Sequence, residues 1–450
     1  MLIDIRVYLS RLVIGLVLIS TWTFIGDFQG VKLSMFLFGC CAFILFIRLS
    51  DRQVWGTRYL FCFQLIVMSI LSINWISYLN PSHVYNVSSN SFIANNSKVE
   101  FLPSSAAPLA TLNDLSYFSF LLGLLPVVVY YGYRHAEFTL IIKFIWYNSL
   151  ILAVVGVIFK YSGSSKILGI FEPPFGTDRY FFSTFTYKNH WGCYLILSIG
   201  AMSYYCEEKN WKFSLRQSIV ILLTIIFFCI SSWLCGSRSC SILMSLVILV
   251  FVWRYIQRVD NNLKVNKYML GLIGLVLLSS LTYVAFVSHP ELSFEYVNST
   301  RIYIEGYLSG DFGTRFYLSR DTWFMFIEKP VFGWGLGSYQ FVFNYYNDGV
   351  FRGPGHLDDH HYVYAHNDIL QNFAELGAVG TLFILVIMVY PIFGCRKSAL
   401  WKPSSIWMLS VLIILLLYCL VEFPLRTPAV SLLFTILIAG LGAKIKAIKY

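Results

Sequence analysis

Long runs of apolar residues, separated by short polar and charged segments, repeat along most of this chain. Most runs can cross about 30 Å of hydrocarbon as a helix, so the pattern predicts an all-α polytopic membrane protein. About twelve transmembrane helices are predicted, at residues 7–26, 33–47, 59–79, 115–132, 139–159, 189–205, 217–235, 240–253, 268–287, 375–393, 405–421 and 429–443.

Longer polar stretches divide these runs and predict a chain in three parts. The parts are residues 1–287, with transmembrane helices 1–9 and outer loops 80–114 and 160–188; residues 288–374, a large helical loop domain; and residues 375–450, with helices 10–12 and a tail. The Asn/Ser-rich stretch 86–97 predicts a mobile outer loop.

Composition supports the membrane assignment. Hydrophobic residues make up 57% of the chain and charged residues only 12%, whereas soluble proteins carry about one quarter charged residues. The ten cysteines lie in or beside the apolar runs, so no disulfide framework is expected. The first run lacks a small-residue cleavage site, which favours a plain transmembrane helix over a signal peptide.

Lysine and arginine residues set the expected orientation. With the N-terminus inside, 20 of the 33 fall on inner segments, so the positive-inside rule places both termini in the cytoplasm. Nine of the others lie in the outer loops 160–188 and 288–366. Long loops cross a membrane whatever their charge, so these residues are either incidental or a basic surface that holds an anion.

The loop 288–366 is the expected working domain. A helix is predicted from Thr314 through Ile327, ending before Lys329-Pro330. Phe316, Trp323 and Ile327 share one side of it, and Arg315 lies on an adjacent polar strip. The glycines of 333–337 predict a tight turn, and without the lysine and serine of a nucleotide loop they do not indicate a nucleotide site.

Four of the eight histidines fall within residues 356–366, beside Asp358 and Asp359. Imidazole and carboxylate groups suit zinc or manganese, so His356, His360 and His361 with these aspartates are a possible metal site. Their spacing matches no recognised ligand signature, and a solvated loop without metal is the commoner interpretation.

His366 has a different local setting. Asp368 is a suitable N-cap for a helix whose apolar face includes Ile369 and Phe373, and Gly377 closes that helix. The helix dipole then favours a neutral imidazole, which can accept a proton from a hydroxyl. Taken alone, a structural histidine at a helix start remains the commoner interpretation.

Arg238 strengthens the functional interpretation. Residues 235–240 join two apolar runs with almost no loop, so this guanidinium lies at the membrane boundary, where a charge is costly. Snorkelling explains such an arginine in part. A bound anion explains it better, because the planar guanidinium fits phosphate oxygens.

Several segments together resemble the O-antigen ligase and polymerase superfamily of bacterial membrane glycosyltransferases. They cover residues 180–440 in the family's order: Phe185-Thr186-Tyr187-Lys188-Asn189-His190-Trp191; Ser237-Arg238-Ser239; Gly313-Thr314-Arg315 through Gly335; His366-Asn367 with Gly377 and Gly380; and Glu422-Phe423-Pro424-Leu425-Arg426-Thr427-Pro428-Ala429. Two positions depart from the family pattern and are given a secondary place: Lys188, where arginine is frequent, and Glu422, where aspartate is frequent.

The resemblance implies a GT-C-like fold and a metal-independent glycosyltransferase without cofactor. Its donor would be a glycan on undecaprenyl diphosphate, and its active site would face the periplasm from the bacterial inner membrane. By position, Arg238 and Arg315 would bind the diphosphate, and His366 would deprotonate the acceptor hydroxyl. The implied substrate-binding residues are Lys188, Asn189, His190, Arg320, Asn367 and Arg426. The lipid bilayer is the other expected partner, and no nucleic acid is expected.

Three alternatives stay open at this point. A ligase transfers to the lipid A core and a polymerase to a lipid-linked repeat unit; the spacing from His366 to Gly380 favours the ligase slightly. A transporter or flippase of lipid-linked glycans fits the composition equally well, but it should place ionisable groups near the bilayer midplane. A metal-dependent hydrolase would depend on the cluster from His356 to His361.

Overall fold

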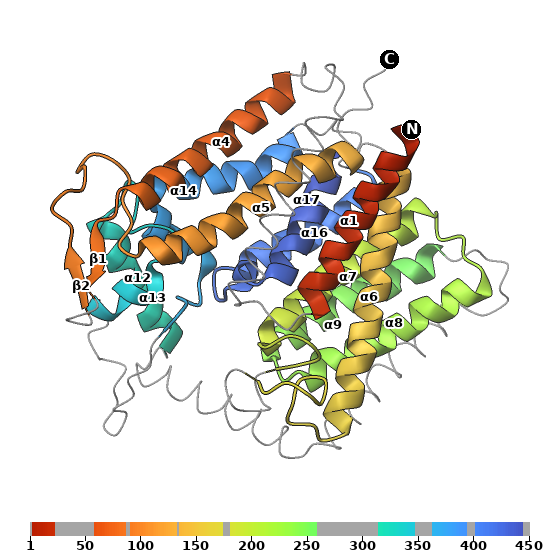
Figure 1. Cartoon of the computed structure of the whole chain (residues 1–450). Helices are drawn as coiled ribbons and strands as arrows, with labels where there is room; N and C mark the ends of the chain where they lie inside the picture. Colours follow the sequence, from red (N-terminus) through yellow and green to blue (C-terminus); the bar gives the residue numbers. More distant parts are fainter. Residues whose placement is uncertain are drawn as a thin grey trace.

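A computed structural model describes residues 2–22, 58–86, 91–132, 135–173, 181–258, 314–346, 362–393 and 401–443 of the chain. Most of these residues are helical (Figure 1). The long helices are α1 (Leu2–Trp22), α4 (Arg58–Leu79), α5 (Pro108–Gly132), α6 (His135–Tyr161), α7 (Lys188–Glu208), α8 (Leu215–Leu234), α9 (Arg238–Arg258), α14 (Asp368–Phe393), α16 (Pro403–Tyr418) and α17 (Pro428–Ala443).

These helices cover ten of the predicted spans, while the spans 33–47 and 268–287 lie outside the described residues. Five helices of the described chain are long and apolar enough to cross a membrane: α4, α6, α8, α9 and α14. Helices α1, α16 and α17 hold shorter apolar stretches. The protein is therefore a helical membrane protein, and the number of crossings stays a prediction.

Helix α7 is the centre of the bundle and packs against α6, α9, α16 and α17. Every residue from Asn189 to Cys206 is buried. Small and hydroxyl residues allow this close packing, because serine hydroxyls bond to carbonyls one turn back; Ser198 donates to Tyr194 and Ser203 to Ile199, each at 2.7 Å.

The prediction of an all-α chain is wrong in the first outer loop. Strands β1 (His83–Asn86) and β2 (Ser91–Ala94) pair antiparallel, with Val84 opposite Ile93. Alternating apolar and polar positions in these short strands form a hairpin within a stretch that its Asn/Ser content marked as a mobile loop.

The hairpin lies beside a small helical unit (Figure 1). This unit contains α12 (Thr314–Glu328), α13 (Tyr339–Val342) and the 3₁₀ turn η1 (Phe343–Tyr345). The predicted helix from Thr314 is confirmed. Leu318 and Met325 on α12 enter a buried core with Trp334, Tyr339 and Phe343, whereas the apolar stripe of Phe316, Trp323 and Ile327 is exposed.

Candidate functional site

The link between α16 and α17, residues 419–427, lies at the centre of the candidate site. Pro424 and Pro428 interrupt helical hydrogen bonding there, so the chain forms the short 3₁₀ turn η2 (Pro424–Arg426) before α17 begins. We call residues 419–427 the α16–α17 turn. It holds a carboxylate on one side, Glu422, and a guanidinium on the other, Arg426.

Glu422 is fully buried and gathers side chains from three distant parts of the chain. Asn189 Nδ2 donates to Glu422 Oε1 at 2.6 Å, and the Arg315 guanidinium binds the same oxygen. His366 Nδ1 lies 3.3 Å from the other oxygen, Oε2. These four residues are called the Glu422 cluster, and three of them are residues that the sequence predicted.

The cluster brings two predicted catalytic groups to one carboxylate while leaving both accessible. The side chain of Arg315 is 43% exposed and that of His366 is 24% exposed, whereas Glu422 is inaccessible. Arginine carries five N–H donors and histidine has a second ring nitrogen, so each can bind Glu422 and still reach a ligand.

Aromatic rings hold the His366 ring in place. Phe423 stacks between Tyr364 and Tyr187, with ring centroids 4.4 and 5.6 Å away. His366 meets the Phe423 ring edge-on at 4.8 Å, and His190 meets it edge-on at 4.9 Å. Such contacts restrict the rotation of the imidazole, so the Glu422 contact has a defined direction.

The backbone at His366 is unusual for a residue with a side chain, since its φ is 51°. The helix that follows, α14, is capped by Asn367, whose Oδ1 accepts from the Leu370 amide at 2.9 Å. Asp368 was predicted as the cap, and that prediction is wrong, because Asp368 is already the first residue of the helix. The cap lies one residue earlier because the Asp368 carboxylate binds the α16–α17 turn instead.

Gly377 interrupts α14 as the sequence predicts, with a φ of 63°. The amides of Ala378 and Val379, freed by this break, bond to the carbonyls of Pro330 at 2.7 Å and Val331 at 3.2 Å. A Cβ at position 377 would collide with the Val331 backbone. Glycine is therefore required to dock the loop after α12 onto α14, which places the start of α12 near His366.

Glu422 carries a negative charge despite its burial. Burial alone would raise the pKa of its carboxyl, but the hydrogen bond from His366 and the charge of Arg315 outweigh it and leave the pKa below the ordinary value. The pKa of Tyr187 shifts upward, first through burial and then through the charge of Glu422. The Tyr187 hydroxyl therefore stays protonated and donates to this carboxylate at 3.5 Å.

Arg426, predicted as a substrate-binding residue, lies on the opposite side of the turn in a closed network. Its guanidinium donates to Glu375 Oε2 and Asn372 Oδ1, each at 2.9 Å, and its Nε lies 3.4 Å from Asp368 Oδ1. Burial alone would lower the pKa of Arg426, but the charges of Glu375 and Asp368 raise it above its usual range. These four residues are called the Arg426 cluster.

Arg238 begins α9, directly after a sharp turn in which Gly236 has a φ of 71°. Its side chain lies outside the part of the chain that the structure describes. Lys188, a predicted substrate-binding residue, lies beside this turn, because its Nζ is 3.8 Å from the position of a Cβ on Gly236. Tyr418 at the end of α16 also contacts it, with its hydroxyl 3.0 Å from Ser239 Oγ. The backbone thus brings Arg238 and Lys188 to one end of the bundle, at the end of α16.

The remaining predicted residues take other positions. Arg320 binds Asp321 at 2.7 Å and lies over the Tyr317 ring, farther along α12 than Arg315. His190 is buried, with Nδ1 2.6 Å from Thr427 Oγ1. The proposed metal cluster of His356, Asp358, Asp359, His360 and His361 lies outside the described residues.

Glu422 is the site residue to which sequence reasoning gave too little weight. In the sequence it stands out only as a departure from the family pattern, where aspartate is frequent. The stronger signal was its setting, a carboxylate at the end of the apolar run 405–421, because an ionisable residue at a membrane span is a functional-site hypothesis by default.

A comparison with protein-family models finds the O-antigen ligase family over residues 219–385. The matched region includes Arg238, Arg315 and His366, but it ends before Glu422 and Arg426. No curated protein matches the chain.

Proposed function

Because the chain belongs to the O-antigen ligase and polymerase superfamily, we propose that it is a membrane glycosyltransferase acting on a lipid-linked glycan. The donor is a glycan on undecaprenyl diphosphate, and the acceptor is a sugar hydroxyl at the outer face of the bacterial inner membrane. One observation carries the proposal: Glu422 joins Arg315, His366 and Asn189, which are far apart in sequence, in a site where Arg315 and His366 are partly exposed.

His366 acts as the general base. His366 Nδ1–H donates a hydrogen bond to Glu422 Oε2, which selects the tautomer with an unprotonated Nε2. Nε2 takes the proton of the acceptor hydroxyl as its oxygen attacks the anomeric carbon of the donor. The bond from that carbon to the diphosphate oxygen breaks, and the diphosphate leaves with the electron pair.

Arg315 and Arg238 stabilise the leaving diphosphate. Charge grows on the phosphate oxygen as the glycosidic bond breaks, and guanidinium groups held beside it lower the energy of that state. Glu422 holds Arg315 in position, and Lys188 beside the start of α9 adds a positive charge at the same end of the bundle. No metal ion has a role in this scheme.

We propose a ligase whose acceptor is the lipid A core. A polymerase would carry out the same chemistry on a second lipid-linked repeat unit. The location of the Glu422 cluster supports transfer rather than transport, because its residues lie at helix ends and in the α16–α17 turn rather than in the middle of the spans.

The decisive experiment uses the purified protein in lipid nanodiscs with an undecaprenyl-diphosphate glycan and, in separate reactions, lipid A core or a second lipid-linked glycan. We expect product on lipid A core, also with excess chelator present. Product only with the second acceptor would replace ligase by polymerase. Product with neither acceptor would overturn the proposal, and chelator-sensitive activity that a divalent metal restores would overturn the metal-free scheme.

The same assay tests the arginines. We expect Arg238→Ala and Arg315→Ala each to lower transfer by about 10²-fold or more, because each removes charge stabilisation from the transition state. Arg258→Ala is the matched control, an exposed arginine at the opposite end of α9 that should leave the rate unchanged. An equal loss in all three variants would show only that the protein needs positive charge.

A further inference from the structure

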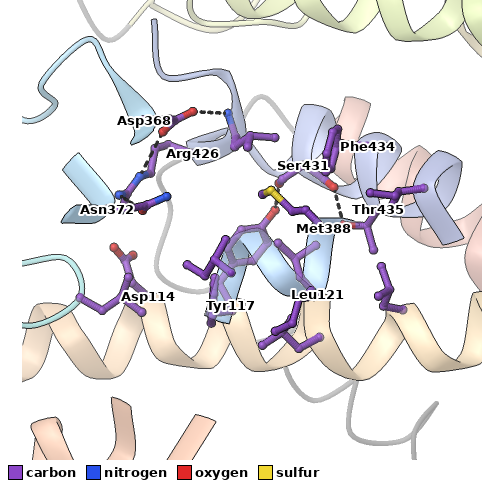
Figure 2. Close-up of a pocket in the computed structure, with 18 of the residues that line it drawn as sticks. Asp114, Tyr117, Leu121, Asp368, Asn372, Met388, Arg426, Ser431, Phe434 and Thr435 are labelled. Carbon is purple, nitrogen blue, oxygen red and sulfur yellow. Dashed lines mark hydrogen bonds and ion pairs between the residues drawn. The ribbon is translucent and has the colours of Figure 1, made fainter. Parts of the chain in front are cut away.

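A cavity of about 140 Å³ lies on the Arg426 side of the α16–α17 turn, between α5, α14 and α17. Figure 2 shows its two unlike ends. Asp114, Asn372 and Arg426 lie at one end, and Leu121 and Met388 point into the other.

The cavity is long in the direction of the helices. Its wall on α5 runs from Asp114 to Leu125, which is about 16 Å at 1.5 Å per residue, or about half of a hydrocarbon core. Polar groups along the wall bond to one another: the Tyr117 hydroxyl pairs with Ser431, and Thr435 Oγ1 donates to the Ser431 carbonyl at 2.7 Å. The long wall therefore offers a ligand mainly apolar contact.

The polar end does not suit a diphosphate. Arg426 is its cation, and that guanidinium already donates to Glu375 and Asn372. Asp114 and Asp368 line the same end, so the carboxylates there outnumber the cation. An anionic headgroup is repelled from this end and favoured on the other side of the turn, beside Arg315.

The cavity also adjoins the Glu422 cluster. Tyr364 lines the cavity and stacks on Phe423 at 4.4 Å, and Phe423 in turn contacts the His366 ring at 4.8 Å. Two aromatic rings, Tyr364 and Phe423, thus connect the cavity to the proposed base.

We propose that this cavity binds the isoprenyl chain of the lipid-linked substrate while the diphosphate lies across the α16–α17 turn. The inference depends on the proposed function for the identity of the lipid. The aromatic rings of Tyr117, Phe118 and Phe434 and the thioether of Met388 provide adaptable apolar contact for a branched, unsaturated chain.

The test uses farnesol with a diazirine at the far end of its chain, which has no diphosphate and so does not depend on Arg315. After irradiation in nanodiscs, peptide mapping should place the label on α5, α14 or α17. Met388→Trp fills the cavity and should lower this labelling about tenfold. Leu382→Trp is the matched control on the same helix, because Leu382 is 62% exposed.

Leu121→Trp repeats the test from the α5 wall and covers the case in which Met388→Trp fails to fold. Equal labelling in Met388→Trp and Leu382→Trp, or label spread over the exposed helix faces, would overturn the proposal. Unlabelled dodecanol that competes as well as unlabelled farnesol would overturn the isoprenyl assignment. Labelling does not require transfer, so an inactive protein that is labelled in the cavity would refute the proposed function and leave this inference standing.

Discussion

The two sides of the α16–α17 turn carry ion clusters of opposite design. In the Glu422 cluster a buried carboxylate lies at the centre, with Arg315 and His366 around it and partly exposed. In the Arg426 cluster a guanidinium that is only 14% exposed lies at the centre, with Asp368 and Glu375 around it.

This difference separates a cluster with partly exposed members from a closed one, and we propose that the first binds an anion and the second stabilises the fold. In the Glu422 cluster, Asn189 is a buried amide, whereas Arg315 and His366 carry the charge or the ring nitrogens and are partly exposed. The outer members of the Arg426 cluster are the carboxylates of Asp368 and Glu375 and the amide of Asn372, and all three accept hydrogen bonds from the Arg426 guanidinium. An arginine is therefore informative about function only when its partners are known.

The largest expected effect is a loss of glycan transfer after a substitution in the Glu422 cluster. His366→Ala should lower glycan transfer by about 10²–10⁴-fold, the usual contribution of a general base. The thermal midpoint in detergent should stay close to that of the wild type, because the side chain is partly exposed. His83→Ala, on the β1 strand away from the site, is the control, and wild-type activity in His366→Ala would remove the base from the mechanism.

In the Arg426 cluster, a substitution should lower the stability of the protein. Arg426→Ala leaves Asp368 and Glu375 buried without their cation, which costs about 3–5 kcal/mol. We expect a large fall in the thermal midpoint and in the yield of folded protein, whereas Arg315→Ala should lower both less, because Asn189 and His366 still bind Glu422. A stable Arg426→Ala protein without transfer activity would erase the distinction and return Arg426 to the substrate-binding residues.

Glu422→Gln should have a smaller effect on transfer. The amide keeps the size of the side chain but weakens its bonds to Arg315 and His366, so we expect a loss of about 10–100-fold in rate. Activity should fall through kcat more than through KM, because His366 is misplaced rather than removed. A rate equal to the wild type would show that His366 needs no partner.

The same variant has a signature in the pH dependence of stability. The pKa of Glu422 is lower in the folded protein than its ordinary value, so its stabilising contribution is present above about pH 4.5 and is lost as the pH falls through the folded pKa. The thermal midpoint of the wild type should fall more steeply than that of Glu422→Gln in this acidic range. Parallel curves would contradict the assigned charge state.

The smallest effect is expected at Lys329, outside both clusters. Burial lowers its pKa to about 8, with the charge of Lys98 acting in the same direction. The unfolded chain then binds more protons between pH 8 and the ordinary lysine pKa of about 10.4, so the stability of the wild type rises with pH there. The thermal midpoint of the wild type, measured relative to that of Lys329→Gln, should increase with pH over this range. A difference between the two midpoints that does not change with pH would refute the lowered pKa of Lys329.

Local patterns were enough for much of the fold. Apolar runs located the ten described long helices, because burial in hydrocarbon requires a continuous apolar segment. The helix from Thr314 and the break at Gly377 also followed from neighbouring residues. The same reasoning placed the α14 cap one residue late, because the Asp368 carboxylate binds the distant Leu425 amide, and it missed the β1–β2 hairpin.

The sequence by itself determined a membrane-embedded helical chain, and it predicted three residues for glycan transfer, Arg238, Arg315 and His366. Only the tertiary structure decided which charges meet. Glu422 binds Arg315, 107 residues away, and Asn189, 233 residues away. Arg426 lies only four positions further along the same turn, but it binds carboxylates of α14 instead. Hydropathy and helical periodicity are properties of neighbouring residues, whereas the neutralisation of a buried charge depends on which distant segments pack against it.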